Sequence, residues 1–198
     1  MNPIDFKRLW EVVIAQFFLD IHSIHGPRHW RQVEKNGLML AKETGADESI
    51  IKLFSLFHDS RRENEYTDDG HGMRGAALAK SMREVHFDLP DDSFEILMEA
   101  CRCHTDGKPA PNITIATCWD ADRLDLPRVG TIPDPDRMGT APGRRLARSQ
   151  HNQPNPLVKG HKRSRHKNGD TQCRIMTTAL PCARTRSAMK HSVISTST

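Results

Sequence analysis

The stretch Ile50-Ile51-Lys52-Leu53-Phe54-Ser55-Leu56-Phe57-His58-Asp59 is apolar along nearly its whole length and ends in a histidine and an aspartate. A helix that is apolar on nearly all sides is buried among other elements. Asp47, just upstream, can cap the first turn through a side-chain oxygen. We therefore predict a buried central helix that begins after Asp47 and ends near His58-Asp59.

Helical patterns flank this central helix on both sides. Gly26-Pro27 separates the first two of them, and Gly45 ends the second. No alternating strand pattern with hairpin turns is present, so the predicted fold class is all-α, a bundle of helices. The other predicted helices cover about residues 3–22, 27–44, 71–85 and 113–126, and a further one contains Phe94 to Ala100.

Charge divides the chain into two unequal parts. Residues 1–140 hold 17 Lys and Arg against 24 Asp and Glu, a net charge of −7, whereas residues 141–198 hold 12 against Asp170 alone, a net charge of +11. The end of the chain is polar or basic without apolar periodicity, and such a segment cannot bury enough apolar surface to fold. We predict a folded domain over residues 1–148 and a basic, low-structure tail over 149–198, whose abrupt onset also fits a frameshifted end.

The chain has no segment typical of a membrane protein. The most apolar run, residues 12–19, is short and is flanked by Glu11 and Asp20. Charged residues near the N-terminus and the lack of a small-residue cleavage site argue against a signal peptide. Five cysteines without regular spacing fit a reducing compartment better than a disulfide framework. We expect a cytoplasmic protein with no membrane partner.

Seven histidines lie within residues 1–140, and five of them fall at the starts or ends of predicted helices. Asp59 and Asp122 occupy comparable positions. Helix ends in a bundle can converge on one site. Imidazoles mixed with carboxylates suit divalent Mn, Fe, Mg, Zn or Co better than they suit soft thiolate sites, so the pattern predicts a metal site. The five histidines are His25, His29, His58, His71 and His104.

Three segments carry a specific resemblance: His29 in His-Trp-Arg-Gln-Val, Phe57-His58-Asp59, and Ala121-Asp122-Arg123-Leu124. Their order and spacing resemble the H…HD…D signature of the HD superfamily of metal-dependent phosphohydrolases, over about residues 20–140. The resemblance implies a metal-dependent hydrolase of phosphate esters, of EC class 3.1, that uses a metal-activated water as a phosphatase or phosphodiesterase. It also implies a helical bundle whose metal ligands are His29, His58, Asp59 and Asp122.

Some members of the superfamily have two further histidines that bind a second metal ion. His71 in His-Gly-Met-Arg-Gly-Ala and His104 in Cys-Arg-Cys-His-Thr lie in the corresponding interval, and Asp59 would then bridge two ions. One ion is expected and the second is left open, because His71 could simply begin a helix and His104 could end one. Cys101-x-Cys103 lacks the spacing of a zinc-thiolate site and is interpreted as structural.

Further roles are predicted around Asp59. Asp120 faces about 200° away from Asp122 on a helix, so Asp120 is expected either to orient a metal ligand or water, or to be the alternative ligand. Arg61-Arg62 suit bidentate contacts to phosphate, or form an ordinary solvated pair. His25 is the expected acid for the leaving group. The predicted catalytic residues are Asp59, Arg61, Arg62 and His25.

The expected partner is a phosphorylated small-molecule substrate, with nucleotides among the candidates. The alternative function is a non-catalytic, metal-containing domain that binds a nucleotide or nucleic acid, with the basic tail attracting phosphate. The tail has no Phe, Trp or Tyr, so base stacking is excluded there. A third hypothesis is that the atypical C-terminus, in place of the helices that normally follow the last aspartate, leaves the chain inactive.

Overall fold

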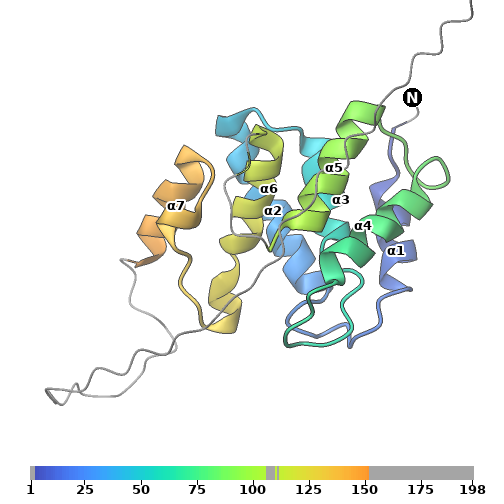
Figure 1. The fold of residues 1–198 in the computed structure, drawn as a ribbon, viewed down its shortest axis with the longest axis horizontal. Coiled ribbons are helices and arrows are strands. Elements are labelled where there is room, and N and C mark those ends of the chain that lie inside the picture. The colour runs from blue at the N-terminus through green and yellow to red at the C-terminus, as the bar shows by residue number, and fades with distance from the viewer. Residues whose placement is uncertain (1–2, 106–109, 111, 152–198) are drawn as a thin grey trace, which may run out of the picture. The chain divides into compact units, whose positions relative to one another are not determined.

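A computed structural model of the chain describes residues 3–105, 110 and 112–151 (Figure 1). Regular structure in these residues is helical and no strand is assigned among them, so the predicted all-α fold class is confirmed. Two short 3-10 helices, η1 (Leu126–Val129) and η2 (Pro135–Arg137), precede the last helix. The α-helices are α1 (Phe6–Ile14), α2 (Pro27–Thr44), α3 (Glu48–Phe57), α4 (His71–Met82), α5 (Asp91–Cys103), α6 (Ile113–Arg123) and α7 (Ala141–His151).

Helix α3 forms the centre of the bundle, as predicted. Asp47 caps its first turn by accepting hydrogen bonds from the amides of Ser49 and Ile50, at 2.8 and 3.2 Å. Seven of its ten residues are buried, and it contacts α1, α2, α4, α5 and α6. Burial of apolar surface stabilises this arrangement by about 25 cal/mol per Å², and it fixes His58 and Asp59 at the C-terminal end of α3.

Two glycines let α4 approach its neighbours closely. A Cβ on Gly72 would lie 2.5 Å from the carbonyl oxygen of Cys101, and a Cβ on Gly75 would overlap the carbonyl oxygen of Phe57. Only residues without a side chain allow backbones to pack at this separation. The start of α4 is therefore held against the C-terminal ends of both α3 and α5.

The first helix is shorter than predicted. Helix α1 ends at Ile14 and irregular turns follow, whereas the pattern predicted a helix through residue 22. Phe17 still packs edge-on against Trp30, with ring centroids 5.0 Å apart, but Ile21 is 55% exposed. The apolar repeat therefore reflected a tertiary contact made from a turn, and only its first half reflected a helix.

Helix α7 was not predicted, and it corrects the expectation that the atypical tail replaces every helix after the last aspartate. Thr140 caps α7 by accepting a hydrogen bond from the amide of Gly143 at 3.0 Å. The helix contacts α2 and α6 (Figure 1) and buries Ala147. The tail predicted from residue 149 thus begins inside α7, and its remainder, 152–198, lies outside the described residues.

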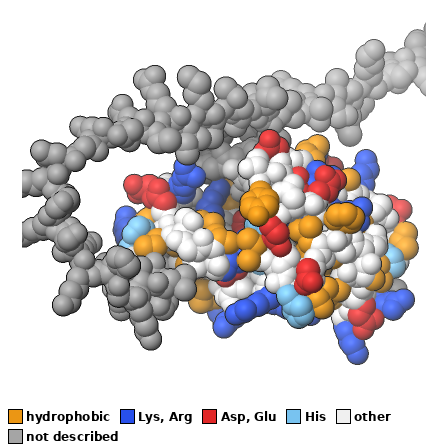
Figure 2. Space-filling model, turned by 90° about the horizontal axis from the view of Figure 1, so that it is seen from below, with side chains coloured by type: hydrophobic (Ala, Val, Ile, Leu, Met, Phe, Trp, Pro, Cys, Tyr) orange, Lys and Arg blue, Asp and Glu red, His pale blue; other side chains and the backbone are white. Residues whose placement is uncertain are grey.

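The described surface carries charges of both signs. Figure 2 shows basic, acidic and hydrophobic side chains interspersed on one face. Recognition of nucleic acid relies on a basic patch or stripe, and this face of the described residues does not display one. Among the described helices, none combines the length and the apolar character that a membrane crossing requires.

Candidate metal centre

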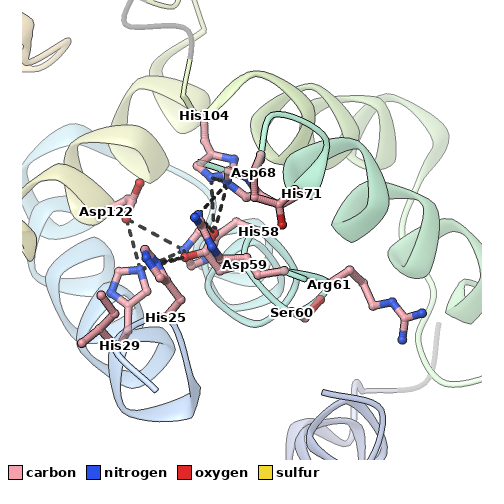
Figure 3. Close-up of polar contacts among 12 residues, drawn as sticks. His25, His29, His58, Asp59, Ser60, Arg61, Asp68, His71, His104 and Asp122 are labelled. Atoms are coloured by element: carbon pink, nitrogen blue, oxygen red, sulfur yellow. Dashed lines mark hydrogen bonds and ion pairs between the residues drawn. The ribbon is translucent and has the colours of Figure 1, made fainter. Parts of the chain in front are cut away.

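All of the predicted metal ligands lie at helix ends, and five helices bring them together (Figure 3). The four histidines and Asp59 are at most 5% exposed, and the Asp122 side chain is 19% exposed. The set consists of His29 in the first turn of α2, His58 and Asp59 directly after α3, His71 at the start of α4, His104 directly after α5, and Asp122 in the last turn of α6.

Asp59 lies between two pairs of histidines. Its Oδ2 atom is 3.6 Å from Nε2 of His29 and 3.8 Å from Nε2 of His58. Its Oδ1 atom is 3.2 Å from Nε2 of His71 and 3.6 Å from Nε2 of His104. We call His29, His58 and Asp59 the first group, and Asp59, His71 and His104 the second group. The ligand atoms of each group lie within 4.8 Å of one another, so each group could hold a metal ion.

Asp122 adds another carboxylate to the first group. Its Oδ1 atom is 3.3 Å from Nε2 of His29 and 3.9 Å from Nε2 of His58. Burial alone would raise the pKa of Asp122, but the hydrogen bond with His29 and the nearby imidazoles hold this pKa well below its usual range. Asp122 is therefore ionised, which suits a cation ligand.

Each of the four histidines has its Nδ1 atom beside a hydrogen-bond acceptor. A carbonyl or carboxylate oxygen can only accept, so Nδ1 carries a proton and donates it. Partners of this kind fix the tautomer and orient the ring of a metal-binding histidine, and Nε2 is left to face Asp59. The acceptors are Asp125 Oδ2 for His29 (2.7 Å), the Ser55 carbonyl for His58 (3.0 Å), the Asp68 carbonyl for His71, and the Cys101 carbonyl for His104 (2.8 Å).

The paired Nε2 atoms face one another at short range, 3.1 Å between His29 and His58 and 2.9 Å between His71 and His104. Burial lowers the pKa of His58 to about 3 and also lowers the pKa of His71. For His29 and His104, burial acts in the same direction, but nearby carboxylates outweigh it and raise the pKa. If both rings of a pair were neutral, the lone pairs on their two Nε2 atoms would face and repel each other. Each pair is therefore suited to one cation between its Nε2 atoms, either a proton or a metal ion.

The Oδ1 atom of Asp59 also fits a cation. It is buried and has no hydrogen-bond partner among the described residues, a situation that costs about 1–3 kcal/mol for an ordinary polar group. Although burial alone would raise the pKa of Asp59, the surrounding histidines hold this pKa well below its usual range. A divalent metal ion in the second group would neutralise this buried negative charge on Asp59.

The structure places Asp120, predicted either to orient a metal ligand or water or to be the alternative ligand, against the start of α7. Its buried carboxylate accepts hydrogen bonds from the amide and the hydroxyl of Thr140, at 2.9 and 2.7 Å, and so anchors the start of α7. Asp125 orients His29 instead. We missed Asp125 in the sequence, although its three-residue spacing from Asp122 suggests a shared helical face.

The two arginines predicted to bind phosphate point in different directions. Arg61, predicted to be catalytic, extends away from the metal groups (Figure 3) and donates to the Gln16 carbonyl at 3.0 Å. Arg62 is buried, with Nη1 3.6 Å from Oδ1 of Asp59, while Nη2 donates to the Tyr66 carbonyl at 2.6 Å. Because the protein itself holds the Arg62 guanidinium, this side chain is placed to orient Asp59 rather than to bind phosphate freely.

His25 lies beside the first group, where a proton donor was predicted. Its Nδ1 atom is 3.0 Å from Oδ2 of Asp59, and its side chain is 14% exposed. Arg128 places Nη2 3.3 Å from the same nitrogen and donates through Nε to the Ile24 carbonyl at 2.9 Å. No sequence pattern marks Arg128, because its place depends on packing of η1 against the turn before α2.

Comparisons with known proteins bear on the fold. No family model matches the chain, and no curated protein matches it. Fold and site together define an all-helical bundle with a buried histidine–aspartate centre that could hold metal. The structure is similar to the crystal structure of a predicted HD superfamily hydrolase from an uncultured Thermotogales bacterium, with a TM-score of 0.58 and 24% identity over 73% of this chain and 84% of that chain. The chain thus shares its fold with that protein, which agrees with the helical bundle that the H…HD…D resemblance implied.

Proposed function

We propose that the chain is a metal-dependent hydrolase of phosphate esters, with nucleotides among the candidate substrates. The observation that carries the proposal is Asp59, one buried carboxylate shared by two pairs of histidines whose Nε2 atoms face it. A divalent ion held there supplies a water of lowered pKa and a positive charge for phosphate oxygens. The likeness in fold to a predicted HD superfamily hydrolase supports this proposal.

The residues around Asp59 have separable roles in this proposal. Arg62 positions the Asp59 carboxylate, while Asp125 fixes the tautomer of His29 through a contact of 2.7 Å. His25 places Nδ1 3.0 Å from Oδ2 of Asp59, and its side chain is partly open to solvent. We assign His25 the transfer of a proton to the oxygen of the leaving group.

The two groups differ in how a substrate could reach them. The histidines of both groups are nearly closed to solvent, at 1% and 0% for His29 and His58 and at 6% and 3% for His71 and His104. Beside the first group, however, the Asp122 and His25 side chains are 19% and 14% exposed. A phosphate ester therefore approaches the first group from the side of His25 and Asp122.

The test is hydrolysis of phenyl phosphate and bis-p-nitrophenyl phosphate by protein that is stripped of metal and reloaded with Mn²⁺, Fe²⁺, Mg²⁺, Zn²⁺ or Co²⁺ in turn. Turnover should appear with at least one ion, vanish with chelator, and vanish in Asp59→Asn. The matched control is Asp92→Asn, because Asp92 is exposed and lies outside both groups. Metal binding without turnover on either ester would instead support the non-catalytic alternative, a metal-containing domain that binds a nucleotide or nucleic acid.

A further inference from the structure

We infer that the cavity beside the first group binds a second anionic group of the substrate, a phosphate or a carboxylate remote from the scissile ester. This inference rests on the proposed function for its link to turnover, but the anion site itself can be tested without any metal. We call this space the Arg28 cavity; it has a volume of about 290 Å³, and its lining includes His22, Arg28, His29, Gln32, Asp125 and Arg128.

The Arg28 cavity adjoins the first group because His29 belongs to both. The His29 side chain lines the cavity, while its Nε2 atom faces Asp59 and Asp122 at 3.6 and 3.3 Å. Arg128 is a second link, since it lines the cavity and reaches the His25 nitrogen that faces Asp59. A ligand in the cavity is therefore next to the side from which a substrate approaches.

Charge on the cavity wall favours an anion. Arg28 is exposed and makes no hydrogen bond or ion pair with the described residues, so all of its donors are available. It lies in the first turn of α2, where the positive end of the helix dipole adds to its charge. Arg128 is held in place by the Ile24 and Asp125 carbonyls, at 2.9 and 3.2 Å.

The one carboxylate on the wall is already engaged. Asp125 Oδ2 contacts His29 Nδ1 at 2.7 Å and lies 3.8 Å from Nε of Arg128. Because His29 and Arg128 already contact the Asp125 carboxylate, the two arginines together make the net charge of the cavity wall positive. Its volume is at the small end of the range of ligand pockets, about 300–1,000 Å³, which favours a small organophosphate over a macromolecule. The substrate class is therefore a phosphate ester that carries a second phosphate or a carboxylate.

A binding experiment on metal-free protein tests the site directly. Inorganic phosphate and acetate are titrated calorimetrically into the unsubstituted chain, Arg28→Gln and Lys35→Gln. Arg28→Gln should weaken binding of the preferred anion about tenfold, the value of one charge-assisted hydrogen bond. Lys35→Gln removes the same charge from an exposed position of the same helix outside the cavity, and it should leave binding unchanged. The anion that binds more tightly identifies the second group, and binding that is absent or insensitive to Arg28→Gln would overturn the inference.

A kinetic experiment links the cavity to the substrate. Phenyl phosphate and 4-carboxyphenyl phosphate, and a bisphosphate analogue if phosphate is the preferred anion, are compared with metal-loaded protein. The ester with the second anionic group should have the higher kcat/KM. Arg28→Gln should move the ratio of the two kcat/KM values toward one, whereas Lys35→Gln should leave that ratio unchanged. A kcat/KM ratio of one for the unsubstituted chain, or a ratio that Arg28→Gln does not change, would refute the proposed preference for a second anionic group. If no ester turned over while anion binding still depended on Arg28, the hydrolase proposal would fail and the anion site would stand.

Discussion

Asp59 and the four histidines around it form a site in which metal binding competes with protons. The pKa values of His29 and His104 are raised, so these rings keep a proton to higher pH than an ordinary histidine does. A metal ion must displace that proton. We therefore predict that Mn²⁺ affinity falls as pH decreases through the pKa values of His29 and His104. Calorimetric titrations from acidic to mildly alkaline pH would measure this, and affinity that is constant or higher in acid would count against the assignment.

Asp125 shows how a residue outside the metal groups acts through one inside them. Its carboxylate holds the Nδ1 proton of His29 at 2.7 Å. Removing such a partner costs about 10- to 100-fold in metal affinity or activity, so Asp125→Ala should weaken metal binding by roughly that factor. Asp92→Ala, at an exposed position outside the site, should not. Equal metal affinity in the two variants would show that Asp125 does not orient His29.

Prediction from sequence succeeded for residues whose position along a helix decides their place. His58 and Asp59 had to lie at the end of the most apolar helix, and His29 had to lie near Pro27, where the next helix begins. Arg61 and Arg62 are adjacent in sequence but point in different directions, because one contacts Gln16 and the other Tyr66. Contacts of this kind depend on tertiary packing, which no local pattern encodes.

Helix α4 carries His71 of the second group, and the packing of α4 against α3 holds His71 near Asp59, which both groups share. It begins at His71, and Gly75 sits against the Phe57 carbonyl. Gly75→Ala would force α4 away from α3, which overpacking data suggest costs about 1–3 kcal/mol, and would displace His71 from Asp59. We expect a lower urea midpoint and weaker metal binding in the second group.

The matched control for this change is Ala77→Ser, an exposed position on the same helix. Because serine is a weaker helix former than alanine by at most about 0.7 kcal/mol, this change should lower the urea midpoint only slightly and keep the metal content. If Gly75→Ala lowered the midpoint no more than that and kept the metal content as well, the close approach of α4 would not be what positions His71.

Helix boundaries were predictable where local chemistry sets them. Pro27 and Gly45 bound α2, and Asp47 caps α3, and the structure has these features in the same places. Helix α7 was missed because its cap, Thr140, is held by Asp120 from α6. The prediction for α1 was too long for a similar reason, because Phe17 is placed by a tertiary contact with Trp30 and not by a helix.

Across the whole molecule, the candidate ligands come from five helices, so a bound ion would tie the bundle together. Any ligand that binds only the folded chain stabilises it, by about 2.7 kcal/mol at a free concentration 100 times the Kd. We predict that a bound divalent metal raises the Tm, and that Asp59→Asn abolishes this rise. The control is Asp92→Asn, which should keep the rise. Equal shifts in both variants would place the bound ion elsewhere.

The central claim is that Asp59 joins two histidine pairs into a centre that binds divalent metal. The most direct measurement is metal content by elemental analysis after stripping, reloading and desalting, for the unsubstituted chain, Asp59→Asn and Asp92→Asn. We predict bound metal in the unsubstituted chain and in Asp92→Asn, and its loss in Asp59→Asn. An unsubstituted chain that retains no divalent ion, or an Asp59→Asn variant that retains as much, would contradict the claim.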